Sequence, residues 1–221
     1  MKIVITSATQ LEVRPLKELV ENHTVKNIHF HTCGVGILQS CFSIQKMIVE
    51  EKPDFIIQAG IAGAYDEHCS LGDVVIVNEE IAGSCGVEEN GEWKDMFDLN
   101  LSEKNNFPFE NMGLGNPFLT KYNLLHLPEV KALTVDEITT NKSRIAILKN
   151  KYNPFIESME GASLHYCALQ YNTAFIQIRG VSNIVGERDK KCWKMKDSVL
   201  NVCQKAFELI RLLNGCPGAA D

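Results

Sequence analysis

Two glutamates and one asparagine stand where predicted strands end. Glu12 lies in the first turn of the helix that follows the first strand, Glu160 follows a strand ending at Met159, and Asn183 closes a buried run. Ligands of open α/β sheets bind at the carboxyl ends of strands, so we expect these side chains to meet. Carboxylates can activate water and hold sugar hydroxyls, and an amide can bind a departing base. The set is therefore compatible with cleavage of an N-glycosidic bond.

Two glycine-containing segments also end predicted strands, at 34–36 (GVG) and 60–63 (GIAG). Glycine permits tight turns and lets a ligand approach the backbone closely, and each segment alone fits either use. Neither segment is a G-x-x-x-x-G-K-[ST] motif, and Gln39 stands where G-x-G-x-x-G needs its third glycine. Glu12 also has a second interpretation when it is considered alone, because a carboxylate in the first turn of a helix stabilises the helix N-terminus.

Alternating strand-like and helix-like patterns predict an α/β domain whose sheet carries helices on its faces. We expect strands at 2–8, 27–34, 54–60, 72–82, 130–138, 154–161 and 174–183, and helices at 11–22, 37–52, 142–152, 162–171 and 195–214. Residues 1–215 are predicted to form a single domain, and 216–221 to be a frayed tail. The irregular, aromatic-containing segment 84–117 is interpreted as a binding loop.

Composition narrows the class of partner. The 221 residues carry a net charge of −6, which disfavours nucleic acid as a partner. The N-terminus resembles a first strand rather than a signal peptide, and no apolar run is long enough for a membrane helix, so we expect a cytoplasmic protein without membrane contact. The eight cysteines show no C-x-x-C pair and the histidines no metal spacing. We therefore predict reduced thiols, no metal and no cofactor.

Five motifs occur in an order that resembles the purine nucleoside phosphorylase and nucleosidase superfamily. They are A-x-x-x-E ending at Glu12, CGVG, QAGIAGA followed by LGDVVI, ESMEGAS and RGVSN. The chain looks most like the hydrolase branch that includes methylthioadenosine/adenosylhomocysteine nucleosidase. The resemblance implies a mixed central sheet between two helical layers, a small nucleoside substrate and a homodimer or larger homo-oligomer.

The resemblance also implies roles for individual residues. Glu12 would be the base that activates the attacking water, and Glu160 would bind the ribose hydroxyls while Met159 packs on the sugar. The remaining candidates would line the pocket floor or bring backbone groups to the base. They are Ser7, Gly60, Ile61, Ala62 and Gly63 for the floor, and Ile138 and Thr139 for the base.

Asn183 departs from the adenine-specific nucleosidases, which have aspartic acid at this position. A protonated aspartic acid can donate to N7 and accept from a 6-amino group, whereas the asparagine NH₂ suits the two acceptors of a 6-oxopurine. The segment RGVSNIVGERDKKCWKMKDSV resembles futalosine hydrolases, a family of menaquinone biosynthesis that cleaves a hypoxanthine nucleoside with a carboxyphenyl-ketone arm at its 5′ position. Arg188, Lys190 and Lys191 are candidates for holding that arm, or form a solvated charge run.

Three other functions remain open at this point. A phosphorylase is disfavoured because the run before Gly60 lacks arginine and because Glu12 points to water as the nucleophile. An adenine-directed nucleosidase is disfavoured by Asn183 and the segment after it. A nucleoside-binding protein without activity is disfavoured by the presence of both Glu12 and Glu160.

Overall fold

The computed structural model describes residues 1–65 and 69–215, so the expected frayed tail lies outside the described residues. The strands are β1 Ile3–Ser7, β2 Ile28–Thr32, β3 Phe55–Ala64, β4 Val74–Ala82, β5 Gly86–Glu89, β6 Glu92–Asp95, β7 Leu114–Gly115, β8 Glu129–Thr134, β9 Ile156–Ser158 and β10 Ala174–Ile184. The helices are α1 Gln10–Asn22, α2 Ile37–Glu51, α3 Leu119–Tyr122, α4 Lys142–Tyr152, α5 Gly161–Gln170, α6 Met195–Leu213 and the 3₁₀ helix η1 Lys190–Cys192.

The large sheet is mixed. Its strand order is β10-β4-β8-β9-β3-β1-β2, with β7 beside β4. Strands β1, β2, β3 and β10 run in one direction, and β4, β8 and β9 run in the other. A further pairing between β10 and β3 joins β3, β10, β4, β8 and β9 into a closed ring. The predicted mixed central sheet is confirmed, and its ring brings the ends of β3, β9 and β10 together.

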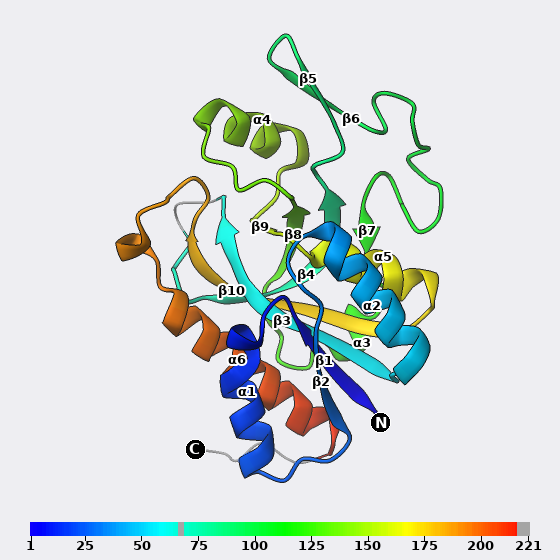
Figure 1. Ribbon diagram of the computed structural model, residues 1–221, viewed down its shortest axis with the longest axis vertical. Coiled ribbons are helices and arrows are strands. Elements are labelled where there is room, and N and C mark those ends of the chain that lie inside the picture. Colours follow the sequence, from blue (N-terminus) through cyan, green and yellow to red (C-terminus); the bar gives the residue numbers. More distant parts are fainter. Residues whose placement is uncertain (66–68, 216–221) are drawn as a thin grey trace.

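Helices cover both faces of the sheet (Figure 1). Side chains of a strand alternate between faces, so Ile3 and Ile5 of β1 pack in one core with α1 and α6. Val4, between them, packs in the other core with α2 and α5. The two apolar cores hold the helices in fixed positions against the strands, as the predicted three-layer arrangement requires.

The segment 84–117 is more regular than its composition indicates. It contains the β5–β6 hairpin, whose turn residues Asn90 and Gly91 have φ of 54° and 79°. Positive φ at both central residues is typical of a tight hairpin turn, and Asn-Gly is its strongest sequence signal. The hairpin is tied to α4, because Trp93 Nε1 donates to Tyr152 Oη over 2.9 Å. The prediction of an irregular loop is wrong for this part of the segment.

Strand β3 continues past residue 60, where the sequence predicts that the strand ends. Residues 60–63 lie inside β3, because β10 pairs with it as far as Ala64 and β9 pairs with Gly63 and Ala64. The predicted end of this strand at residue 60 is therefore wrong, and of the two uses considered for 60–63 the tight turn is excluded. The backbone of these residues lies against side chains of neighbouring elements, namely Glu12 and Arg179 at Gly60 and Asn183 at Gly63.

Candidate active site

A pocket of about 420 Å³ opens over the second half of β3. It brings together Glu12 from α1, Glu160 from the start of α5 and Asn183 from β10. The predicted site residues that line it are Glu12, Ile61, Ala62, Gly63, Ile138, Met159, Glu160 and Asn183. Three separate chain segments thus supply the polar groups expected from the sequence.

The direction of β9 explains how Glu160 reaches this pocket. β9 runs antiparallel to β3, with Ile156 opposite Ala64 and Glu157 opposite Gly63. The chain therefore travels back along β3 toward Gly60 before α5 begins. This return places the Glu160 carboxylate near the start of α1, where Glu12 lies.

Backbone donors hold the Glu12 carboxylate in place. Its Oε2 accepts from Thr9 N over 2.9 Å and lies 3.1 Å from Thr9 Oγ1, and its Oε1 accepts from Ile61 N over 3.3 Å. Ser7, predicted for the pocket floor, is fully buried and does not line the pocket. Its hydroxyl donates instead to Thr9 O over 2.8 Å, which fixes the turn that presents Glu12.

Glu160 lies between a backbone donor and a buried guanidinium. Its Oε1 accepts from Gly36 N over 3.2 Å, and its Oε2 lies 3.9 Å from Nη2 of Arg179, whose side chain is 1% exposed. Burial raises the pKa of the Glu160 carboxyl, while Arg179 and the Gly36 N–H act in the opposite direction. Both partners favour the ionised form, which accepts hydrogen bonds from hydroxyl groups.

Gly60 leaves room for these charged groups. A Cβ at this position would lie 2.5 Å from Arg179 Nη1 and 2.8 Å from Glu12 Oε1. Gly60 itself is not part of the pocket lining. Its contribution is the absence of a side chain, which lets Glu12 and Arg179 rest on the backbone of β3.

A β-bulge directs Asn183 into the pocket. The register of β10 against β3 shifts between Val181 and Asn183, so Ser182 is the extra residue and Asn183 lies beside Gly63. Ser182 Oγ lies 2.8 Å from Asn183 Oδ1, and Asn183 Nδ2 donates to Ile184 O over 2.9 Å. These two contacts orient the amide and leave the second N–H of Nδ2 for a ligand.

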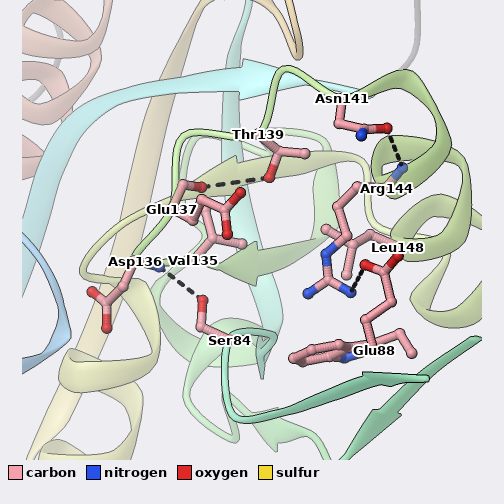
Figure 2. A pocket seen from close by; sticks show the side chains of 10 residues that line it. Ser84, Glu88, Val135, Asp136, Glu137, Thr139, Asn141, Arg144 and Leu148 are labelled. Carbon is pink, nitrogen blue, oxygen red and sulfur yellow. Dashed lines mark hydrogen bonds and ion pairs between the residues drawn. The ribbon is translucent and has the colours of Figure 1, made fainter.

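Thr139 lies outside this pocket although Ile138 lines it. Figure 2 shows Thr139 in a neighbouring pocket with Glu88, Asp136 and Arg144. The Arg144 guanidinium stacks on Trp93 at 3.7 Å from the ring centroid, and its Nη1 lies 3.9 Å from Glu88 Oε2. Arg144, a cation of this second pocket, is thus already engaged by Trp93 and Glu88.

The three basic residues considered for the 5′ arm are separated by the structure. Arg188 lines the pocket, whereas Lys190 and Lys191 form the exposed helix η1 and do not line it. Arg188 is the only cation among the described lining residues, which also include the carboxylates of Glu12, Glu157, Glu160 and Glu187. The pocket is therefore predominantly acidic.

Two polar residues of the site were missed in the sequence. Glu157 lines the pocket beside Met159, and the Arg179 guanidinium lies next to the Glu160 carboxylate. A signal for Arg179 is present, since it is a charged residue inside the apolar run AFIQIRGV and is fully buried there. Glu157 gave no such signal, because its partner Tyr65 is distant in the chain.

A buried polar cluster beneath the pocket positions the start of α5. Glu80 of β4 is fully buried and accepts from Gln177 Nε2 and Thr134 Oγ1, each over 2.8 Å. Thr134 Oγ1 in turn accepts from Ala162 N, two residues beyond Glu160. Burial raises the pKa of the Glu80 carboxyl to about 7, although both donors oppose the shift.

Glu80 makes stability depend on pH. Its folded pKa of about 7 exceeds the ordinary 4.5, so its contribution is complete below the ordinary pKa and is lost as pH rises through 7. We expect the unfolding free energy of the wild type to fall by about 2 kcal/mol more than that of Glu80→Gln between pH 5 and pH 8. Urea unfolding of both proteins measures this difference. Parallel pH profiles would contradict it.

The described residues contain no group of three potential metal-ligating side chains, and no disulfide joins their cysteines. Within the same residues, no helix combines the length and apolar character needed to span a membrane.

Comparison with known proteins gives a matching family and several similar proteins. Residues 2–213 match the family described as the phosphorylase superfamily. A futalosine hydrolase of Thermus thermophilus is 27% identical over 180 residues, covering 80% of this chain and 78% of that protein. A 5′-methylthioadenosine/S-adenosylhomocysteine nucleosidase of Bacillus licheniformis is 24% identical over 212 residues, covering 86% and 89%.

The fold also matches a solved structure. The futalosine hydrolase of Helicobacter pylori superposes with a TM-score of 0.79 at 15% identity, covering 96% of this chain and 98% of that one. The superfamily and fold predicted from the sequence are thereby confirmed. The relatives by sequence are N-glycosyl hydrolases, in agreement with the predicted class of enzyme.

Proposed function

Because the chain belongs to the phosphorylase superfamily, we propose that it hydrolyses the N-glycosidic bond of a 6-oxopurine nucleoside modified at its 5′ position. Futalosine is the substrate we favour, with hypoxanthine as the released base. The observation that carries the proposal is the meeting of Glu12, Glu160 and Asn183 in one pocket. Together they provide a group for the water, one for the sugar and one for the base.

The proposed reaction divides among these three groups. Glu12, held by the N–H groups of Thr9 and Ile61, takes a proton from the attacking water. Glu160 accepts hydrogen bonds from the ribose hydroxyls, and its negative charge favours the oxocarbenium-like sugar. Asn183 donates its second N–H to the base as negative charge develops there. Met159 lines the pocket beside Glu160, where its thioether can pack on the sugar.

The charge of the pocket supports water rather than phosphate as the nucleophile. Four glutamates and one arginine line it, and a phosphate dianion would be repelled by that balance. Arg179 lies close by, but its guanidinium already contacts Glu160 and donates to Gln58 Oε1 over 2.9 Å. These contacts favour a hydrolase over a phosphorylase.

The same pocket offers groups for an aromatic, anionic 5′ arm. Arg188 and Trp193 both line it, and the guanidinium lies 5.9 Å from the Trp193 ring centroid. Trp193 Nε1 donates to Glu187 O over 3.1 Å, which fixes the ring. We propose that Arg188 pairs with the carboxylate of the arm and that Trp193 contacts its phenyl ring.

The chain is also proposed to act as a homodimer. Leu38 and Phe42 of α2 are 85% and 70% exposed, and Val49 on the same helix is 50% exposed. Spacings of four and eleven residues place these side chains on one face, so a second copy can cover an apolar stripe. Light scattering coupled to size-exclusion chromatography measures the mass in solution.

Release of free base tests the proposed function. Futalosine, inosine and methylthioadenosine are incubated separately with the enzyme in phosphate-free buffer, and the products are separated by chromatography. We expect hypoxanthine from futalosine, unchanged when phosphate is added. Adenine from methylthioadenosine with no hypoxanthine from futalosine would assign the chain to the adenine-directed nucleosidases instead. A nucleoside-binding protein would leave all three substrates intact.

A further inference from the structure

Three strands place Glu157, Gly63 and Asn183 side by side. Glu157 of β9 is opposite Gly63 of β3, and Asn183 of β10 is opposite Gly63 on the other side. Residues opposite one another on adjacent strands direct their side chains to the same face. Glu157 and Asn183 therefore stand on one face of the sheet, and both line the pocket.

The middle position of this row carries no side chain. The backbones of Glu157 and Asn183 are two strand spacings apart, about 10 Å. A Cβ at Gly63 would lie 3.2 Å from Asn183 Nδ2 and 3.2 Å from Val185 Cγ2, closer than ordinary contact. Gly63 thus lets the Asn183 amide lie close against the β3 backbone, and the pocket that Gly63, Glu157 and Asn183 line together can receive the edge of a planar base.

Tyr65 prepares Glu157 to act as an acceptor. Tyr65 Oη donates to Glu157 Oε2 over 2.6 Å, whereas Oε1 accepts no hydrogen bond from the described residues. Burial raises the pKa of the Glu157 carboxyl to about 7, and donation by Tyr65 opposes that shift. In the ionised form the free oxygen can only accept a hydrogen bond, so it needs a donor on the ligand.

We infer that Glu157 is a specificity-determining residue that accepts the N1–H of a 6-oxopurine while Asn183 binds the N7 and O6 side. The two edges of the base match the two residues. A 6-oxopurine has acceptors at N7 and O6 and a donor at N1, whereas adenine has an acceptor at N1. Adenine would direct its N1 lone pair at the Glu157 carboxylate. The inference rests on the proposed function and extends it to the opposite edge of the base.

Methylation at N1 isolates this hydrogen bond. Free-base release is measured at pH 8, above the pKa of Glu157, from a 6-oxopurine nucleoside that the wild type cleaves and from its N1-methyl derivative. Competition by hypoxanthine and 1-methylhypoxanthine against the same substrate gives a second, binding readout. The variants are Glu157→Met, which removes both oxygens at similar length, and Glu157→Gln, which keeps one acceptor.

We expect N1-methylation to lower kcat/KM of the wild type by about 10- to 100-fold, because the carboxylate loses its donor and meets a methyl group. Glu157→Met should lose a similar factor with the unmethylated substrate and show little further loss with the methylated one. Glu157→Gln should retain most activity, since its NH₂ can donate to Tyr65 Oη and its oxygen can accept from N1–H. Competition by the two bases should follow the same pattern.

Two results would overturn the inference, and they differ in whether the proposed function also fails. If the wild type releases hypoxanthine but methylation costs it no more than it costs Glu157→Met, the proposed function stands and the role of Glu157 does not. If the wild type releases adenine and no hypoxanthine, both fall. Should Glu157→Met not fold, equal competition by hypoxanthine and 1-methylhypoxanthine for the wild type overturns the inference.

Discussion

Glu12→Gln is expected to fold like the wild type and to lose about 10²- to 10⁴-fold in kcat, the range contributed by a positioned general base. The wild-type carboxylate is held by N–H groups of Thr9 and Ile61 on its two oxygens. An amide can accept only on its oxygen, so its NH₂ would face one of these donors, and it cannot take a proton from water. Initial rates in phosphate-free buffer and the melting temperature measure the two effects separately.

A matched control is available on the same helix. Glu18 is exposed on α1 and pairs with Arg14 across one turn, so Glu18→Gln should leave kcat unchanged. If Glu12→Gln keeps wild-type turnover, Glu12 is not the base. If it loses activity together with its cooperative unfolding transition, the loss reflects folding rather than catalysis.

Asn183→Asp is expected to lower cleavage of a 6-oxopurine nucleoside by about 10- to 100-fold. In the wild type, Nδ2 donates to Ile184 O, and Ser182 Oγ lies 2.8 Å from Oδ1. An aspartate would place an oxygen where Nδ2 now faces the Ile184 carbonyl, so it would need a proton to satisfy that contact. That proton is then engaged, and the N7 and O6 acceptors of the base lose their donor.

The prediction is measured as kcat/KM for the 6-oxo substrate and for its 6-amino counterpart. Their ratio should fall, because the carboxyl can accept from a 6-amino group and an amide NH₂ cannot. Asn150→Asp makes the same chemical change at an exposed position of α4 and should leave the ratio untouched. An unchanged ratio in Asn183→Asp would mean that the base is recognised elsewhere.

The pattern of apolar residues within single strands and helices was sufficient to predict the layers of this fold. The alternation of Ile3, Val4 and Ile5 assigns successive side chains to opposite cores, and the structure places them there. Helix α4 spans the predicted residues, because Asn141 caps it by accepting from Ser143 N and Arg144 N, and Asn153 ends it in the left-handed region. The sequence contains these signals within a few residues of where they act.

The remaining features depend on pairing between distant segments. Nothing near residues 60–63 shows that β9 and β10 pair with β3 as far as Ala64, so the sequence predicts a strand that ends at residue 60. Glu157 likewise acquires its place only when β9 runs back along β3 and meets Tyr65. Ser7 ends β1, and its hydroxyl donates to Thr9 O instead of facing the pocket.

The most direct test of the account compares two nucleosides that differ only at position 6 of the purine. Both carry the futalosine 5′ arm, one with a 6-oxo and the other with a 6-amino group, and kcat/KM is measured for each in phosphate-free buffer. The account predicts a preference of at least about 10-fold for the 6-oxo compound, since Asn183 presents a donor to the base. Equal rates, or a preference for the 6-amino compound, would contradict it.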